Sequence, residues 1–192
     1  VGRDFAKSAI IERGGVKVGV FGLVTPELKS VVSCPEGCGV DAELAAVAER
    51  YVRGLRAAGA DAVVAINHIG LPLDKKLAAE ARGIDVIAGG HTHDVVEETK
   101  IIDNGTNATI IGQAGLDGRY AGRFDVTVDE GGLVAEKSSW TLLRVTPETR
   151  GVPEAEAMGR AAQREIAAAL KISNPNMGLT LSLLHISEPT RQ

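Results

Sequence analysis

The chain lacks a large excess of charge of either sign and lacks long apolar runs. Its 192 residues carry a formal net charge of −4 at pH 7, and no segment is rich in Lys and Arg. It therefore has no general electrostatic attraction for nucleic acid or for an anionic membrane surface. No apolar stretch approaches the roughly 18 residues that a membrane-spanning helix needs. The N-terminus has neither a start Met nor a signal peptide, so we interpret Val1 as a cut into a longer protein.

Cysteine is also scarce. The two cysteines, Cys34 and Cys38, lie in a loop that contains Pro and Gly. Their spacing allows a local disulfide in an oxidising compartment or two free thiols elsewhere, whereas a zinc site would need two more ligands nearby. The sequence leaves the disulfide and the compartment open.

The first half of the chain has the pattern of parallel strand–helix–strand units. The size and the 44% hydrophobic content fit one domain, or one domain plus a piece of another. Apolar runs predict strands at 16–24, 61–67 and 84–88. Apolar stripes predict helices from Asp41 to Ala58, with Asp41 as N-cap, and from Asp74 to Ala81. This order favours parallel βαβ units with right-handed crossovers.

After His93 the pattern changes to strands without intervening helices. These strands are predicted at 95–102, 107–113, 121–129 and 133–144. Short Gly-containing turns between them favour antiparallel hairpins. We therefore expect an α/β fold, an α+β sandwich of two packed sheets with helices outside.

The C-terminal part is predicted to be a helix followed by a tail. Residues 153–171 form an Ala-rich helical pattern opened by Pro153, and its thin apolar face is typical of a connector. Residues 181–192 resemble the translation of a sequencing adapter, so we exclude them, and His185 with them, from the fold. The predicted organisation is a main domain at 1–150, a connector helix at 151–174 and a disordered tail at 175–192.

Three of the four histidines lie at the ends of predicted strands. His68 follows the strand at 61–67, and His91 and His93 follow the strand at 84–88 after two glycines. Neighbouring strand ends lie side by side, at the edge where α/β proteins place their chemistry. If the backbone stays extended, His91 and His93 point the same way. Neutral imidazoles so placed would form a metal half-site, and hydrogen-bonded loop histidines are the alternative.

Four motifs occur along the chain in a fixed order. They are Val18–Glu27, Asn67–Gly70, Gly90–His93 and Gln113–Gly122. Together they resemble the second half of the metallophosphoesterase domain of the bacterial 5′-nucleotidase and UDP-sugar hydrolase family, over roughly residues 10–170. The resemblance implies a calcineurin-like α/β sandwich at 1–150 that binds two divalent metal ions and hydrolyses nucleotide phosphate esters. The fourth motif receives no chemical role.

The resemblance also implies roles for single residues. His68 and His91 resemble ligands of one metal, and His93 resembles a ligand of the other, with Zn, Mn, Fe, Co or Mg as the candidate ions. We interpret Asn67 as a loop former and Asp94 as a solvated loop residue.

Part of the family pattern is missing. The motifs that supply the bridging carboxylate and the catalytic His would lie before Val1. The domain whose aromatic residues clamp the nucleoside would follow the connector, and the aromatic content here is only 3%. We therefore expect an inactive fragment that has no catalytic residue of its own. Its partners would be a nucleotide or other small phosphate ester and the missing parts of its own parent chain.

Two other functional hypotheses stay open. A thiosulfohydrolase-like enzyme or a 2′,3′-cyclic-nucleotide phosphodiesterase would share this half-domain. A non-catalytic module without bound metal is the hypothesis from another class. The family resemblance implies a periplasmic or cell-surface location.

Overall fold

The computed structural model describes residues 6–33 and 39–169. The predictions for Cys34 and Cys38 and for the tail at 175–192 lie outside the described residues.

The chain separates into two compact units. One unit holds the chain up to Leu116 together with Tyr120–Arg144. The other holds Asp117–Arg119 and the chain from Val145 onward. His68, His91 and His93, the three histidines predicted to bind metal, all lie in the first unit.

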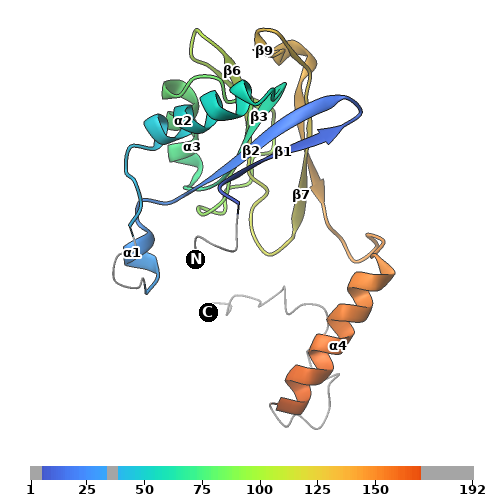
Figure 1. Cartoon of the computed structure of the whole chain (residues 1–192). Coiled ribbons are helices and arrows are strands. Elements are labelled where there is room, and N and C mark those ends of the chain that lie inside the picture. Colours follow the sequence, from blue (N-terminus) through green and yellow to red (C-terminus); the bar gives the residue numbers. More distant parts are fainter. Residues whose placement is uncertain (1–5, 34–38, 170–192) are drawn as a thin grey trace. The chain divides into compact units, whose positions relative to one another are not determined.

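The first unit is built on a six-stranded sheet with the order β1-β2-β3-β4-β6-β5 (Figure 1). The strands are β1 (Ser8–Arg13), β2 (Val16–Val24), β3 (Ala62–His68), β4 (Val86–Ala88), β5 (Lys100–Asp103) and β6 (Ala108–Gly112). The central strands β2, β3, β4 and β6 are parallel, and the edge strands β1 and β5 are antiparallel to their neighbours. The expected parallel units are confirmed. The carboxyl ends of the parallel strands share one edge of the sheet.

Two helices pack against one face of this sheet. A short helix α1 (Leu28–Val31) precedes α2 (Leu44–Ala57), which covers β2 and β3, and α3 (Leu71–Glu80) lies beside α2 (Figure 1). The expected N-cap of α2 is wrong. Asp41 accepts a hydrogen bond from the amide of Glu43 two residues later, so it forms a turn before the helix, and Glu43 is the N-cap.

The helix α3 begins three residues before the predicted start at Asp74. Gly70 has φ +89° and redirects the chain from β3 into the helix, a conformation that costs glycine little. Pro72 then lies in the first turn, where its missing amide is not needed. Asp74 is therefore not the first residue of the helix. It lies in the first turn of α3, on the buried side.

The second half contains antiparallel pairs, as expected, with different partners. The strands β5 and β6 form a hairpin, but β6 also joins the main sheet parallel to β4. Two further pairs follow, β7 (Tyr120–Asp125) with β10 (Ser139–Arg144) and β8 (Val128–Asp129) with β9 (Gly132–Leu133). A 3₁₀ turn at Ala135–Lys137 connects β9 to β10. The predicted strands at 121–129 and 133–144 are thus each divided in two.

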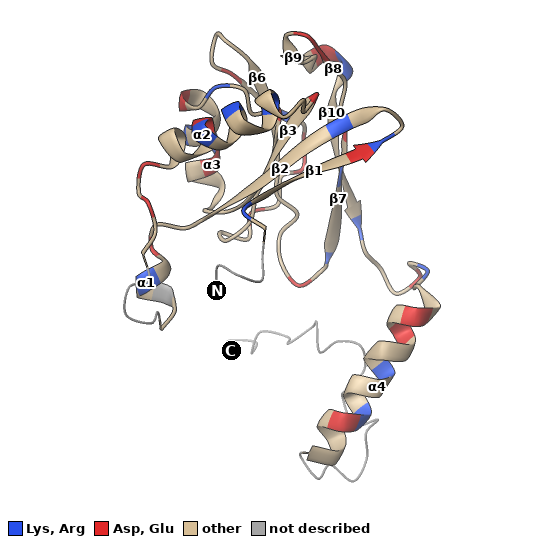
Figure 2. Ribbon diagram, viewed as in Figure 1, with Lys and Arg blue, Asp and Glu red and all other residues tan. Residues whose placement is uncertain are grey.

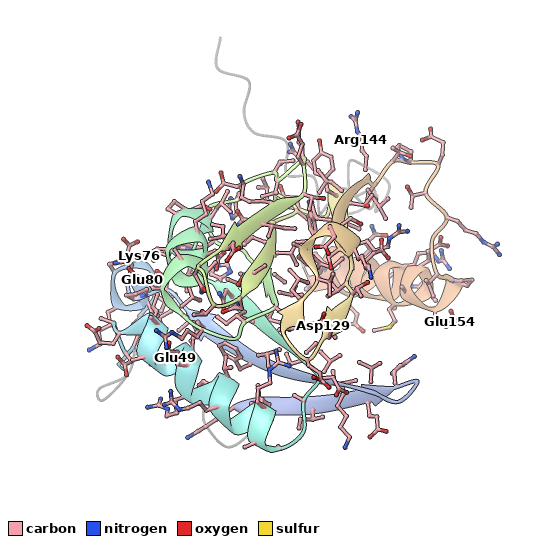
Figure 3. All side chains as sticks on the ribbon, turned by 90° about the horizontal axis from the view of Figure 1, so that it is seen from above. Glu49, Lys76, Glu80, Asp129, Arg144 and Glu154 are labelled. Carbon is pink, nitrogen blue, oxygen red and sulfur yellow. The ribbon has the colours of Figure 1, made fainter. Side chains whose placement is uncertain are left out.

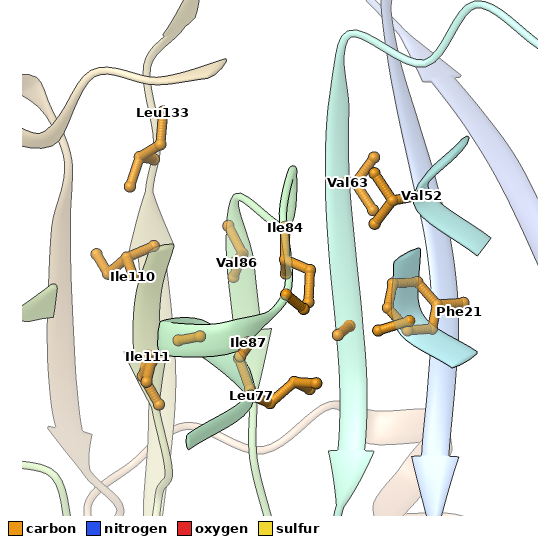
Figure 4. Packing of buried hydrophobic residues seen from close by; sticks show 14 of the residues in the cluster. Phe21, Val52, Val63, Leu77, Ile84, Val86, Ile87, Ile110, Ile111 and Leu133 are labelled. Atoms are coloured by element: carbon orange, nitrogen blue, oxygen red, sulfur yellow. The ribbon is translucent and has the colours of Figure 1, made fainter. Parts of the chain in front are cut away.

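The hydrophobic core lies between α2, α3 and the sheet and continues on the opposite side under β10. Leu77 of α3 lies close to Ile87 of β4 (Figure 4), and the ring of Phe21 in β2 stacks on that of Tyr51 in α2 at 5.4 Å. On the opposite face, the buried ring of Trp140 lies against the backbone of β6 and β7 and donates from Nε1 to the Val96 carbonyl over 2.6 Å. The exposed side of α3 is charged, with Lys76 beside Glu80 (Figure 3).

One part of the sheet has an apolar surface that the described chain leaves exposed. Ile11, Val24 and Ile66, from β1, β2 and β3, lie on the face opposite α2 and are 53%, 38% and 58% exposed. Lys17 is the only charged residue of β2 and β3 (Figure 2). His68 alternates with Ile66 along β3, so it lies on this same face.

The second unit contains the predicted C-terminal helix. The helix α4 runs from Pro153 to Ala169, with acidic residues in its first turn (Figure 2). Glu156 forms an exposed ion pair with Arg160 at 3.4 Å. The last two residues of the predicted helix, 170 and 171, lie outside the described part. None of the described helices is long and apolar enough to cross a bilayer.

Candidate metal centre

His68 and His91 come together at the carboxyl edge of the sheet. His68 is the last residue of β3, and His91 follows the neighbouring strand β4 after two glycines. The register aligns Ile66 with Ala88, so β4 ends two residues before β3, and the two glycines after β4 run alongside the end of β3. The two imidazole centroids are 5.1 Å apart, and the ring planes cross at 63°. The structure thus brings two nitrogen-bearing rings into contact near the surface.

Glycines hold the two loops at backbone-contact distance. The Gly70 amide donates to the Gly90 carbonyl at 3.0 Å, which joins the β3–α3 turn directly to the loop after β4. A Cβ atom at Gly90 would lie 3.1 Å from Nδ1 of His68, and one at Gly70 would lie 2.8 Å from Cγ2 of Thr92. Larger residues would push the loops apart. The Gly-Gly-His sequence therefore fixes how closely the imidazoles approach.

The predicted extended geometry around Thr92 is wrong. His91 and His93 have φ of +85° and +58°, so both adopt left-handed backbone conformations that residues other than glycine seldom take. The alternation that would aim both rings the same way does not apply. His93 is exposed, and within the described residues no three His, Cys, Asp or Glu side chains gather into a group that could hold a metal ion.

The donor chemistry of the pair nevertheless fits one side of a metal site. In the described part of the chain, the ring nitrogens of His68 and His91 make no hydrogen bond. Imidazole nitrogens suit Zn²⁺, Fe and other borderline ions. In a metal site the pair would supply two such ligands, and further ligands would have to come from elsewhere.

A buried polar pair lies behind the loop. Asn67 and Asp74 are 4% and 0% exposed, and Nδ2 of Asn67 donates to Oδ1 of Asp74 at 2.8 Å. Burial raises the pKa of Asp74 from 3.8 to about 6, and the hydrogen bond from Asn67 partly opposes this rise. The other carboxylate oxygen of Asp74 lies against Gly89, where any Cβ atom would overlap it. Asn67 is therefore not a loop former, because it is a buried strand residue that ties β3 to α3.

A second polar cluster surrounds Thr92. Its Oγ1 accepts from the Leu71 amide at 3.1 Å, donates to Oδ2 of Asp94 at 2.5 Å and lies 3.3 Å from Oε1 of Gln113. Oε1 of Gln113 also accepts from the Asp94 amide at 3.1 Å. Asp94 is half-buried and hydrogen-bonded, so its interpretation as a solvated loop residue is wrong. Gln113, just after β6, also has more contact with this loop than the sequence indicated.

Three buried polar atoms around the loop have no hydrogen-bond partner in the described part of the chain. They are Oδ1 of Asn67, Oδ2 of Asp74 and Nε2 of Gln113. Each such atom is unfavourable by about 1–3 kcal/mol in a folded protein. Their concentration at one edge of the sheet is typical of a functional site, where stability is not optimised.

Sequence reasoning missed Asp74, Thr92 and Gln113. The sequence held one indication for Asp74. A carboxylate on the buried face of a helix needs either a hydrogen-bonding partner or a functional role. The contacts of Thr92 with Leu71 and Gln113, and of Gln113 with Asp94, join residues that are 19 to 21 positions apart in the chain. No local spacing could have predicted those contacts.

The comparisons with known proteins point to one class. No protein-family profile matches the chain. It is 34% identical over 149 residues to the trifunctional nucleotide phosphoesterase YfkN of Bacillus subtilis, covering 77% of this chain and 10% of that protein. A 5′-nucleotidase precursor of Thermus thermophilus superposes with a TM-score of 0.75 at 28% identity, over 85% of this chain and 35% of that one. The sulfate thiohydrolase SoxB of Thermus thermophilus superposes with a TM-score of 0.71 at 30% identity, over 84% and 29%.

These superpositions show that the chain has the fold of a calcineurin-like phosphoesterase. Within that class, the chain is similar to 5′-nucleotidases and to YfkN, and the similarity to YfkN covers 77% of its residues. The chain spans only about a tenth of YfkN and about a third of the Thermus nucleotidase precursor.

Proposed function

We propose that this chain is part of a phosphoesterase that hydrolyses nucleotide phosphate esters with two divalent metal ions. It would contribute the carboxyl edge of the sheet that carries His68 and His91, here called the histidine edge. The observation that carries the proposal is the contact of the His68 and His91 rings at adjacent strand ends, 5.1 Å apart. The names of the relatives, nucleotide phosphoesterase and 5′-nucleotidase, support the substrate class.

The residues of this chain would act as ligands and as their support. His68 and His91 would hold one ion, and His93 is assigned to the second by its motif alone. Divalent ions bound here would supply an activated water and would balance the negative charge of the phosphoryl group. Zn, Mn, Fe, Co and Mg all remain candidates for these ions.

The exposed sheet face supports completion of the site by another segment of the parent protein. His68 shares that face with Ile66, which is 58% exposed. Exposed contiguous apolar surface favours an interface. A segment packed there would reach the histidine edge, and it could bring the carboxylates that two dipositive ions require.

Metal binding by the 192-residue chain tests the proposal. We expect one Zn²⁺, Co²⁺ or Mn²⁺ ion to bind weakly and no useful phosphatase turnover to occur with any of them. His91→Ala should weaken the binding at least about tenfold, because it removes one of two ligands. His185→Ala is the matched control, and it should leave the affinity unchanged.

Two results would contradict this proposal. If elemental analysis and calorimetry detect no ion bound above the level of His91→Ala, the chain is the non-catalytic module. Robust turnover by the chain, abolished by His91→Ala, would mean that the remaining ligands lie within these residues.

A sulfate thiohydrolase is the second candidate, favoured by the likeness to SoxB at a TM-score of 0.71. The flanking coding sequence would allow the longer protein to be expressed and assayed. We expect release of phosphate from nucleoside 5′-monophosphates, and cyclic-nucleotide or sulfate-releasing activity instead would favour the alternatives. A periplasmic or cell-surface location is likewise a proposal, testable by fractionation of cells that express the longer protein.

A further inference from the structure

The side chain of Thr92 connects the two histidine loops. Thr92 follows His91, and its Oγ1 accepts a hydrogen bond from the Leu71 amide at 3.1 Å. Leu71 is the first residue of α3 and lies three positions after His68. One hydroxyl therefore links the loop of His91 to the turn of His68.

This hydrogen bond caps the N-terminus of α3, although the capping side chain belongs to a different loop. The first amides of a helix have no partner within the helix, and a side chain at the N-cap usually accepts from one of them. The N-cap of α3 is Gly70, which has no side chain and makes no side-chain cap. Because Thr92 accepts from Leu71 instead, the start of α3 is held in place by the loop that carries His91.

Gln113 holds the other side of the same loop. It is 1% exposed and follows β6, so its side chain comes from a third strand end. Its Oε1 accepts from the Asp94 amide at 3.1 Å and lies 3.3 Å from Oγ1 of Thr92. Its Nε2 has no hydrogen-bond partner in the described residues. The side chain is therefore oriented so that Oε1 accepts hydrogen bonds while Nε2 makes none.

We propose that Thr92, supported by Gln113, is a positioning residue that sets the geometry of the His68–His91 pair for a divalent cation. The inference rests on the proposed function, because it assumes that the pair binds a metal ion. Thr92 would not be a ligand. It would act through its contact with Leu71, which joins the two loops, and through its contact with Asp94, which lies within the loop of His91.

Cobalt titration of the 192-residue chain tests this inference, read by calorimetry and by the visible absorption of Co²⁺. Thr92→Val keeps the shape and removes the hydroxyl, and we expect about 10–100-fold weaker Co²⁺ binding, the usual effect of losing a group that orients ligands. Thr92→Ser keeps the hydroxyl, and its affinity should stay within about threefold of the original.

Thr109→Val is the matched control for a purely structural effect. Thr109 is fully buried in β6, and its hydroxyl donates to the Ile84 carbonyl at 2.7 Å, away from the histidine edge. This variant should lower the thermal midpoint of the metal-free chain and leave the Co²⁺ affinity unchanged. A structural role for Thr92 would give the same result as Thr109→Val.

The outcomes separate this inference from the proposed function. If the original chain binds Co²⁺ and Thr92→Val binds it equally well, the positioning role is refuted and the metal site stands. If the original chain binds no more Co²⁺ than the His68→Ala, His91→Ala double variant, the metal site fails and the positioning role fails with it. Should Thr92→Val not fold, Thr92→Ala removes the same hydroxyl at an exposed position and carries the same expectation.

Discussion

Replacing Asp74 by Asn should make the stability of the chain less dependent on pH. Asp74 is fully buried, and burial raises its pKa from 3.8 to about 6. The folded state therefore binds the Asp74 proton more tightly than the unfolded state does. The contribution of this group to stability is full below about pH 4 and is lost as the pH rises to about 6.

The size of the effect follows from the same pKa change. At about 1.4 kcal/mol for each tenfold change in proton affinity, moving the pKa from 3.8 to about 6 corresponds to about 3 kcal/mol. Proton linkage leaves about 2 kcal/mol of this at pH 4.5 and almost none at pH 7.5. Asp74→Asn cannot ionise, so its stability relative to the original chain should rise by about 2 kcal/mol between these two pH values.

Urea unfolding followed by circular dichroism at several pH values measures this difference. Subtracting the free energy of unfolding of one protein from that of the other cancels the contributions of all other titrating groups. These include Asp85, whose pKa is also raised by burial. Asp103→Asn is the matched control, because Asp103 is exposed and accepts a hydrogen bond only in its own turn. A stability difference between Asp74→Asn and the original chain that stays constant from pH 4.5 to 7.5 would refute the reasoning.

Two further substitutions test the packing and the buried ion pair by urea unfolding. Gly122→Ala would place a methyl group inside the ring of Trp140, and we expect a loss of about 1–3 kcal/mol or more, whereas Gly54→Ala on open helix surface should gain about 0.5–1 kcal/mol. Arg56→Met should lose about 3 kcal/mol, because it leaves the carboxylate of Asp85, which Arg56 contacts at 2.6 Å, buried and unpaired. Adding Asp85→Asn should recover part of that loss, and a fully additive double variant would show that the pair is not coupled.

Where a strand or helix is defined by its own residues, the sequence analysis predicted it well. The strand β2 has the bounds expected from its apolar run, Val16–Val24. The helix α2 ends at Ala57, one residue before the predicted end at Ala58, and Gly59 with φ +89° follows. Both features depend on local periodicity and backbone preference, which can be read without knowing the fold.

Errors arose where tertiary contacts decide the structure. The helix α3 was predicted to begin at Asp74, but it begins at Leu71, and Asp74 lies in its first turn with its carboxylate hydrogen-bonded to the buried Asn67. The strands after His93 were expected to pair with sequence neighbours. Instead β7 pairs with β10 across the β8–β9 hairpin, which a local turn pattern does not distinguish from simple hairpins.

In the candidate site, too, some features could be predicted from the sequence and others could not. That His68 and His91 meet could be predicted from strand order alone, since adjacent parallel strands end at one edge. The direction of His93 could not, because it depends on left-handed backbone at His91 and His93. Of the hydrogen bonds that Thr92 makes beside that backbone, those with Leu71 and Gln113 come from residues 21 positions away in the sequence.

These unfavourable local features have a common physical consequence. Left-handed histidines, a buried carboxyl group at Asp74 and an unpaired amide nitrogen at Gln113 each oppose folding, and all of them lie around one loop. The loop keeps this conformation because the contact of Gly70 with Gly90 and the core beneath it compensate. Substitutions that relieve the strain should therefore stabilise the fold. Release of the Thr92 hydrogen bonds should instead loosen the histidine pair, so stability and metal affinity can be varied separately at this edge of the sheet.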